Sequence, residues 1–381
     1  MEPIVLSDLK TLTEVEAGLR SIDESRGAPL QVQRDAVNKR SGALYDAARL
    51  QLFVTWARAA KEENIHFHPS NNMDALIEKL CDYAPGIAML RMAGGVQVGE
   101  QIVGRREALR QAREKMQLTD DEDLPNIIKG RCIDMTCVSG MRLQYLAPLF
   151  SLRSPNASKD AAGMLGLFKR LFARIAQQDQ ELLPESFLQA ISIFSSELFR
   201  NTQEHATSNH RYDEYIAHVE GFIASWGVME ERLFKSDFEG HQKLRNFWAR
   251  ESLVSREPGM SSVRCLQLSF FDSGPGFASR AAGKPTIELT RDEERRILIQ
   301  CLQKNFTTKQ QTGAGQGIPG VLSALRDIGG LIKIRSGRHS IFNCFGLGES
   351  NQLFEFDDWS EEELAEAAGA VVTIIIPLRV N

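Results

Sequence analysis

The sequence predicts an α/β protein in two parts: a smaller N-terminal α/β domain, and a C-terminal sandwich of one mixed sheet covered by helices. Three observations lead to this prediction. A chain of 381 residues is too long for one ordinary compact domain. A polar stretch that contains a proline interrupts it at residues 151–161, which we expect to be a linker. Beyond this linker, helical patterns alternate with apolar strand-like runs, which is typical of an α/β sandwich.

Residues 1–150 are expected to form the N-terminal domain. An apolar stripe at helical spacing predicts a long helix, and alternation over Ile-His-Phe-His predicts a short strand that ends before a proline. We interpret this part as a regulatory or partner-binding domain. The expected elements are helices over about 41–63, 73–83 and 98–117, and strands over 65–68 and 131–138.

Residues 162–381 are expected to form the larger domain, with a helical insertion at about 207–262. The insertion carries several aromatic residues, so it is interpreted either as a dimer or partner surface or as additional core packing. The other expected elements are helices over about 162–178, 184–206 and 319–327, and strands over 263–271, 330–335 and 370–377.

The composition argues against several classes of protein. A net charge of −5 gives the chain no overall attraction to nucleic acid or to an anionic membrane. No apolar run reaches the length of about eighteen residues that a membrane helix needs, and the N-terminus lacks the pattern of a secretory signal. The six cysteines are scattered without a Cys-x-x-Cys pair, which favours free thiols in a reducing cytoplasm.

The first segment that suggests chemistry is the end of the predicted helix over 184–206. Glu197 and Asn201 lie one helical turn apart and therefore project from the same face. An amide oxygen can bind Mg²⁺ while a neighbouring carboxylate orients or deprotonates a water molecule. Taken alone, the pair is equally typical of a solvated helix face.

Two later segments add glycine-containing turns. The apolar strand over 263–271 ends in Asp272-Ser-Gly274-Pro-Gly276, where a carboxylate could accept a hydrogen bond from an adenine amino group beside a tight turn. An ordinary turn at a strand end has the same composition. Further on, glycines alternate before a predicted helix, and the amides at a helix N-terminus favour a triphosphate. The residues in this loop are Thr307, Thr308, Lys309, Gly313, Gly315 and Gly317, and a flexible linker is the alternative.

In this order, the segments resemble the boxes of the GHKL superfamily, the ATPase fold of the large heat-shock chaperones, type II topoisomerases, MutL and histidine kinases. The N box is similar to residues 197–206, the G1 box to 272–276, and the G2 box with its lid to 307–317. The closing strands also follow the family pattern. The resemblance covers about 162–381 and implies a Bergerat fold that binds Mg²⁺ and ATP.

The resemblance also implies roles for individual residues. Glu197 would be the general base, Asn201 the Mg²⁺ ligand and Asp272 the acceptor for the adenine amino group. The glycines of the G1 box would lie against the adenine base, and those of the G2 box would surround the phosphates. Thr308 and Lys309 would contact phosphate. Two departures stand out: the G2 box ends in Gln-Gly-Ile-Pro, and Ala370 occupies a position where many relatives carry a threonine.

Three functions remain open from the sequence. The first is an ATPase that acts as a nucleotide-driven switch within a larger regulatory or multi-protein system. The second is a protein kinase of the anti-sigma-factor type that phosphorylates a partner, and the third is an ATP-sensing module without turnover. We favour the ATPase, because no histidine precedes the ATP domain on a suitable helix. A homodimer and a protein partner for the N-terminal domain are further expectations.

Overall fold

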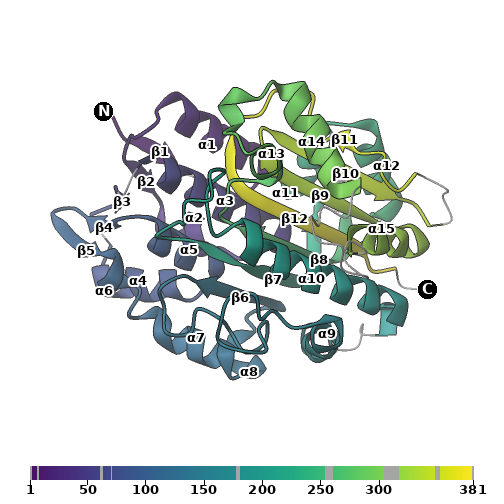
Figure 1. Ribbon diagram of the computed structural model, residues 1–381, viewed down its shortest axis with the longest axis horizontal. Coiled ribbons are helices and arrows are strands. Elements are labelled where there is room, and N and C mark those ends of the chain that lie inside the picture. Colours follow the sequence, from purple (N-terminus) through teal and green to yellow (C-terminus); the bar gives the residue numbers. More distant parts are fainter. Residues whose placement is uncertain are drawn as a thin grey trace.

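The computed structural model describes residues 2–6, 8–60, 63–69, 71–176, 181–253, 261–303, 317–347 and 352–379. These residues form two β-sheets with helices packed around and between them (Figure 1). The α/β class is therefore confirmed. The predicted division at residue 150 does not coincide with the two sheets, because the strand over 132–138 belongs to the second one.

The smaller sheet has five strands and lies at the left of Figure 1. Its first four strands are parallel to their neighbours, and the fifth forms an antiparallel edge. In spatial order the strands are β1 (Ile4–Leu6), β2 (Leu30–Val32), β3 (Asn64–Phe67), β4 (Gly95–Val98) and β5 (Gln101–Gly104). The hairpin of β4 and β5 replaces the beginning of the helix that we predicted over 98–117.

The larger sheet has seven strands, and every described pairing within it is antiparallel. The expectation of a mixed sheet is therefore wrong. Strands buried on both faces give the same continuous apolar pattern in either orientation, so the sequence does not distinguish them. In spatial order the strands are β11 (Asp357–Asp358), β10 (His339–Phe345), β9 (Gly330–Gly337), β12 (Ala367–Pro377), β8 (Ser262–Asp272), β7 (Val219–Glu230) and β6 (Cys132–Val138).

Strand β7 corrects the prediction of a helical insertion over 207–262. It lies inside the larger sheet between β6 and β8, and both of its faces are largely buried, so it lacks the alternation that marks a half-exposed strand. The glycines at 221 and 227, which are unfavourable within a helix, were the available signal against the helical interpretation. The aromatic residues of this region are buried in the core, namely Trp226, Phe234, Phe247 and Trp248. This favours core packing over an exposed surface.

The helices nearest the larger sheet lie on its two faces. One face is covered by α9 (Ala161–Ile175), α10 (Glu185–His205) and α15 (Gly317–Ile328), and the other by α3 (Ala43–Ala60). The remaining helices are α1 (Leu12–Glu24), α2 (Arg34–Asn38), α4 (Met73–Cys81), α5 (Ala84–Met92), α6 (Arg105–Ala108), α7 (Ala112–Asp120), α8 (Leu124–Ile127), α11 (Glu231–Phe234), η2 (Lys235–Phe238), α12 (Gln242–Glu251), α13 (Phe277–Ala282), η3 (Thr286–Glu288) and α14 (Arg291–Gln303).

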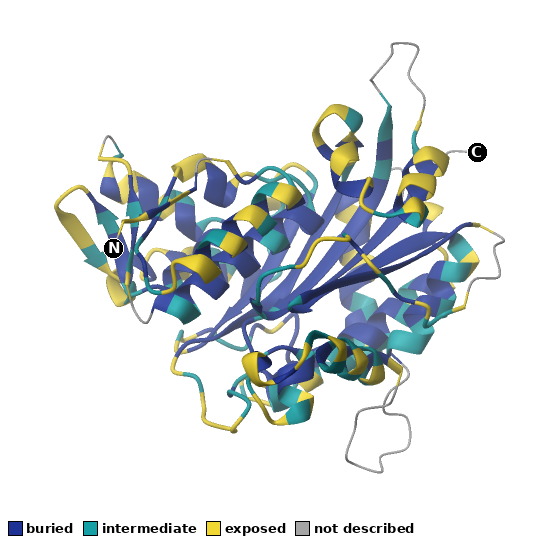
Figure 2. Cartoon of the chain, turned by 90° about the horizontal axis from the view of Figure 1, so that it is seen from above, coloured by how far each residue is buried: buried dark blue, intermediate teal, exposed yellow. Residues whose placement is uncertain are grey.

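Helix α3 connects the N-terminal part to the larger sheet. Figure 2 shows that the long strands of the larger sheet are mostly buried, and α3 is buried around most of its circumference as well. Its polar side chains bond the sheet: Gln51 donates to the carbonyls of Arg335 and Ala368, each at 3.2 Å, and the hydroxyl of Thr55 accepts from the amide of Ala368 at 2.9 Å. A helix that is apolar on most sides belongs inside a core.

Candidate functional site

Helix α10 presents Glu197 and Asn201 one turn apart, as its sequence predicts. The helix is fixed by apolar contacts, including edge-to-face packing of Phe194 against Phe270 of β8. Asn201 is exposed and borders a cavity, and its side-chain amide forms no hydrogen bond with the described part of the chain. Glu197 lies outside the lining of that cavity, and its Oε2 accepts a hydrogen bond of 2.9 Å from the amide of Gly317.

Asp272 is the last residue of β8 and lines the same cavity as Asn201. It pairs across the strands with Ala370 of β12 on one side and with Glu220 of β7 on the other. Burial raises the pKa of the Asp272 carboxyl to about 6, against the lowering effects of the amides of Gly274 and Ala370 and the charge of Arg58. The Gly274 amide donates to Oδ1 at 2.7 Å. The carboxylate is thus held in place with Oδ1 engaged by the turn.

A cavity of about 250 Å³ collects residues from the first two motifs. Asn201 from α10, Asp272 from the end of β8, and Gly276 from the following turn all lie on its wall. Ala370, the position where the sequence departs from the GHKL pattern, lies there too. The lining residues that the sequence interpretation missed are Leu198, Thr202, His205, Ala206, Tyr212, Pro275, Phe277, Arg280, Ala281 and Cys301.

The two glycines of the Asp272 turn have different roles. Gly276 has a φ of +83°, and a Cβ there would lie 2.8 Å from the Ser336 hydroxyl. Gly274 does not line the cavity; a Cβ on it would lie 2.6 Å from the Cβ of Ala206 at the end of α10. Gly274 therefore allows the turn to pack closely on α10, while Gly276 adopts a backbone conformation that other residues rarely adopt.

Most of the predicted phosphate loop lies outside the described residues. Thr308, Lys309, Gly313 and Gly315 lie outside the described residues, and Gly317 is the first residue of α15. Among the predicted loop residues, only Gly317 therefore has a described position, in contact with Glu197 on α10.

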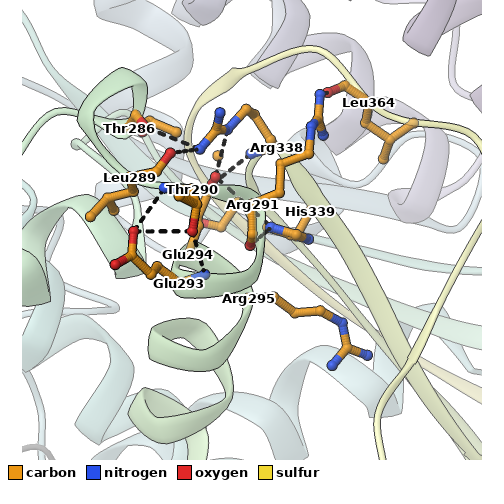
Figure 3. A network of polar contacts seen from close by, with 12 residues as sticks. Thr286, Leu289, Thr290, Arg291, Glu293, Glu294, Arg295, Arg338, His339 and Leu364 are labelled. Carbon is orange, nitrogen blue, oxygen red and sulfur yellow. Dashed lines mark hydrogen bonds and ion pairs between the residues drawn. The ribbon is translucent and has the colours of Figure 1, made fainter.

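The helix that precedes this loop is fixed by a buried ion pair. Figure 3 shows Glu294 of α14 against Arg338, which lies between β9 and β10; the Arg338 Nε and backbone amide donate to it at 2.7 and 2.8 Å. The Arg338 guanidinium also bonds the carbonyls of Thr286 and Leu289. Glu294 is only 1% exposed, so this contact holds the start of α14 to the sheet.

Glu220 is a second buried carboxyl, directly opposite Asp272. It is 1% exposed, and burial together with the charge of Asp272 raises its pKa from the ordinary 4.5 to about 8. The Gln203 amide nitrogen donates to its Oε1, whereas its Oε2 and the Gln203 Oε1 have no partner among the described residues. A carboxyl with a pKa of about 8 is mostly protonated at neutral pH. The sequence interpretation missed this residue because it expected a helix there.

The N-terminal part reaches this site through Arg58 of α3. Its guanidinium donates to the carbonyls of Ser273 at 2.9 Å and Ala217 at 3.0 Å, and it lies 3.6 Å above the ring of Tyr215. Ser273 directly follows Asp272 in the motif. The turn that carries the candidate adenine-binding carboxylate is therefore bonded to a helix from the first 60 residues.

The described ranges contain no group of three or more His, Cys, Asp or Glu side chains that could hold a metal ion. Within those ranges, no helix combines the length and the apolar character needed to cross a membrane. Comparisons with protein-family models, with curated proteins and with solved structures give no match to this chain.

Proposed function

We propose that the cavity binds Mg²⁺ and ATP, and that the protein is an ATPase of the GHKL type built on a Bergerat-like fold. The observation that carries this proposal is the convergence of Asn201, Asp272 and Gly276 on one cavity wall. They come from two motifs far apart in the sequence. Each motif alone has an ordinary structural explanation, but these explanations do not account for their meeting at one cavity.

The residues present fit a magnesium nucleotide. Mg²⁺ typically keeps several water ligands and takes only one or two from the protein, with phosphates supplying the rest. Asn201 offers an amide oxygen that no described residue engages. Bound Mg²⁺ would neutralise phosphate charge. Asp272 offers a carboxylate oxygen to an exocyclic amino group, which is the hydrogen-bonding feature that distinguishes adenine from hypoxanthine.

Glu197 is assigned as the base that takes a proton from the attacking water. It lies one turn from Asn201 on α10, and its contact with the first residue of α15 places it beside the helix start where phosphate is expected. The hydrolytic cycle would act as a switch through the contact between Arg58 and the Asp272 turn. A nucleotide in the cavity would contact that turn, so its binding and release would change the contact with Arg58.

Titration calorimetry with MgATP and a phosphate-release assay test this proposal. Wild-type protein is expected to bind MgATP and to release phosphate. Asn201→Ala should lose the Mg²⁺ dependence of binding, and Asp272→Asn should weaken discrimination between ATP and ITP, which carries hypoxanthine. Absence of MgATP binding in the wild type would overturn the proposal. Transfer of labelled phosphate to a partner protein in place of release would assign the site to a kinase.

A further inference from the structure

A tight turn borders the cavity just after α10. The side-chain oxygen of Asn209 accepts from the amides of Arg211 at 2.8 Å and Asp213 at 3.0 Å, and its amide nitrogen donates to the Asp213 carboxylate at 2.9 Å. The backbone closes the same loop, since the Tyr212 amide donates to the Asn209 carbonyl at 3.0 Å. Asn209 therefore organises this turn from within.

Arg280 of α13 fastens the turn to the cavity wall. Its guanidinium donates to the Asn209 carbonyl at 2.9 Å, to the Ser208 hydroxyl at 3.2 Å and to the Glu204 carbonyl at 3.2 Å. Because a guanidinium donates in its own plane, such bonds leave its faces available for stacking. Arg280 is one helical turn beyond Gly276, so the turn and the Asp272 motif share an anchor.

Tyr212 is the residue that this scaffold presents. Its ring lies 4.0 Å from the Arg280 guanidinium and borders the cavity, yet the residue is 70% exposed. Its φ is +70°, a left-handed conformation that is uncommon for an aromatic residue. Such conformations persist where the surroundings impose them, and they cluster at ligand-binding positions. Because the Tyr212 ring is largely exposed, packing in the protein's own core does not explain its enforced conformation.

We propose that Tyr212 is a stacking wall for the base of the bound nucleotide, and that Asn209 and Arg280 are positioning residues that hold it there. This inference rests on the proposed function. An aromatic ring can cover a planar base regardless of its hydrogen-bonding pattern, so Tyr212 supplies affinity while Asp272 supplies the preference for an amino group. The guanidinium of Arg280, which also lines the cavity, packs on the ring and helps to hold it in place.

The test compares the affinities of MgATP and of magnesium tripolyphosphate, which has no base, by titration calorimetry. The informative variant is Tyr212→Asn, because asparagine tolerates the left-handed backbone but lacks the ring. Tyr212→Phe keeps the ring. Leu152→Ala serves as a control, since Leu152 is similarly exposed at 69% and does not line the cavity. Thermal melting of each variant shows whether the fold is retained.

Tyr212→Asn is expected to weaken MgATP binding about tenfold or more and to leave tripolyphosphate binding unchanged. Tyr212→Phe and Leu152→Ala should remain within about twofold of the wild type. Unchanged MgATP affinity in Tyr212→Asn overturns the stacking role, as does an equal loss for both ligands. If the wild type binds tripolyphosphate but not MgATP, or binds neither, the proposed function itself fails. Asn209→Ala, which loosens the turn, should reproduce part of the Tyr212→Asn effect.

Discussion

The Glu197 carboxylate accepts a hydrogen bond of 2.9 Å from the amide of Gly317, the first residue of α15. The residue assigned as the base thus also satisfies an amide at the positive end of a helix. A Cβ on Gly317 would lie 2.8 Å from the Glu197 Oε2 and 3.0 Å from the Cα of Phe194, so no larger residue fits without displacement. A phosphate bound at this helix end would compete with Glu197 for the same amide.

The first prediction separates these two roles of Glu197. Glu197→Gln retains an oxygen that can accept from Gly317 but cannot take a proton, so phosphate release should fall about 100-fold or more while stability stays near that of the wild type. Glu197→Ala should lose the same activity and also about 1 kcal/mol of stability. Phosphate release and urea unfolding measure the two effects. Hydrolysis that survives in Glu197→Gln would remove Glu197 from the chemistry.

The second prediction concerns the pH dependence of nucleotide binding. Because the pKa of Asp272 is raised to about 6, its ionised fraction falls between pH 7 and pH 5. An ionised acceptor makes the stronger hydrogen bond, so MgATP affinity should weaken about fivefold over this range. Asp272→Asn should abolish this component. Tripolyphosphate titrated in parallel corrects for protonation of the phosphates, and an identical pH profile for wild type and Asp272→Asn would contradict the assignment.

The third prediction concerns Glu220 and stability. Its folded pKa of about 8 lies above the ordinary 4.5, so the folded state retains a proton that the unfolded state has lost between these values. The stabilising contribution is therefore complete below about pH 4.5 and is lost as pH rises to about 8. Glu220→Gln keeps a donor for Gln203 at every pH. Urea unfolding should show that the stability of Glu220→Gln relative to the wild type increases from pH 5 to pH 8. A difference in stability that stays constant over this range would contradict the raised pKa of Glu220.

The fourth prediction concerns the ion pair between Glu294 and Arg338. Removing one partner of a buried pair leaves an uncompensated charge, so Glu294→Ala should lower the free energy of unfolding by about 3 to 5 kcal/mol. Glu293→Ala is the matched control, because Glu293 is a neighbouring, only partly buried residue whose side chain accepts from Thr290. The Glu293→Ala variant should lose about 1 kcal/mol of the free energy of unfolding. Equal losses in the two variants would show that the buried pair adds nothing to α14.

The sequence predicts the local parts of this site well, because they depend on local periodicity. The helix that carries Glu197 and Asn201 and the strand that ends at Asp272 both lie where the pattern places them. Their convergence on one cavity could be inferred only from a family resemblance. No local pattern in the sequence reports the distance between α10 and β8.

Other parts of the site depend on contacts that sequence periodicity does not encode. Glu220 faces Asp272 only because β7 is a central strand, and a strand buried on both faces has no alternation to reveal it. Tyr212 is placed by the Asn209 turn and by Arg280, and Asn209 and Arg280 are 71 residues apart along the chain. The turn could have been suspected from its Asn and Asp, but its position beside the cavity could not.

The burial of α3 has a consequence for how the chain can be divided. A fragment that begins after residue 161 would lack α3 over one face of the larger sheet and would also lack the edge strand β6. Such a fragment would expose an apolar surface and an unpaired strand edge, both of which favour aggregation. Residues 162–381 and the first 138 residues are therefore expected to fold as one unit, and neither can be exchanged for a module from another protein without rebuilding the shared core.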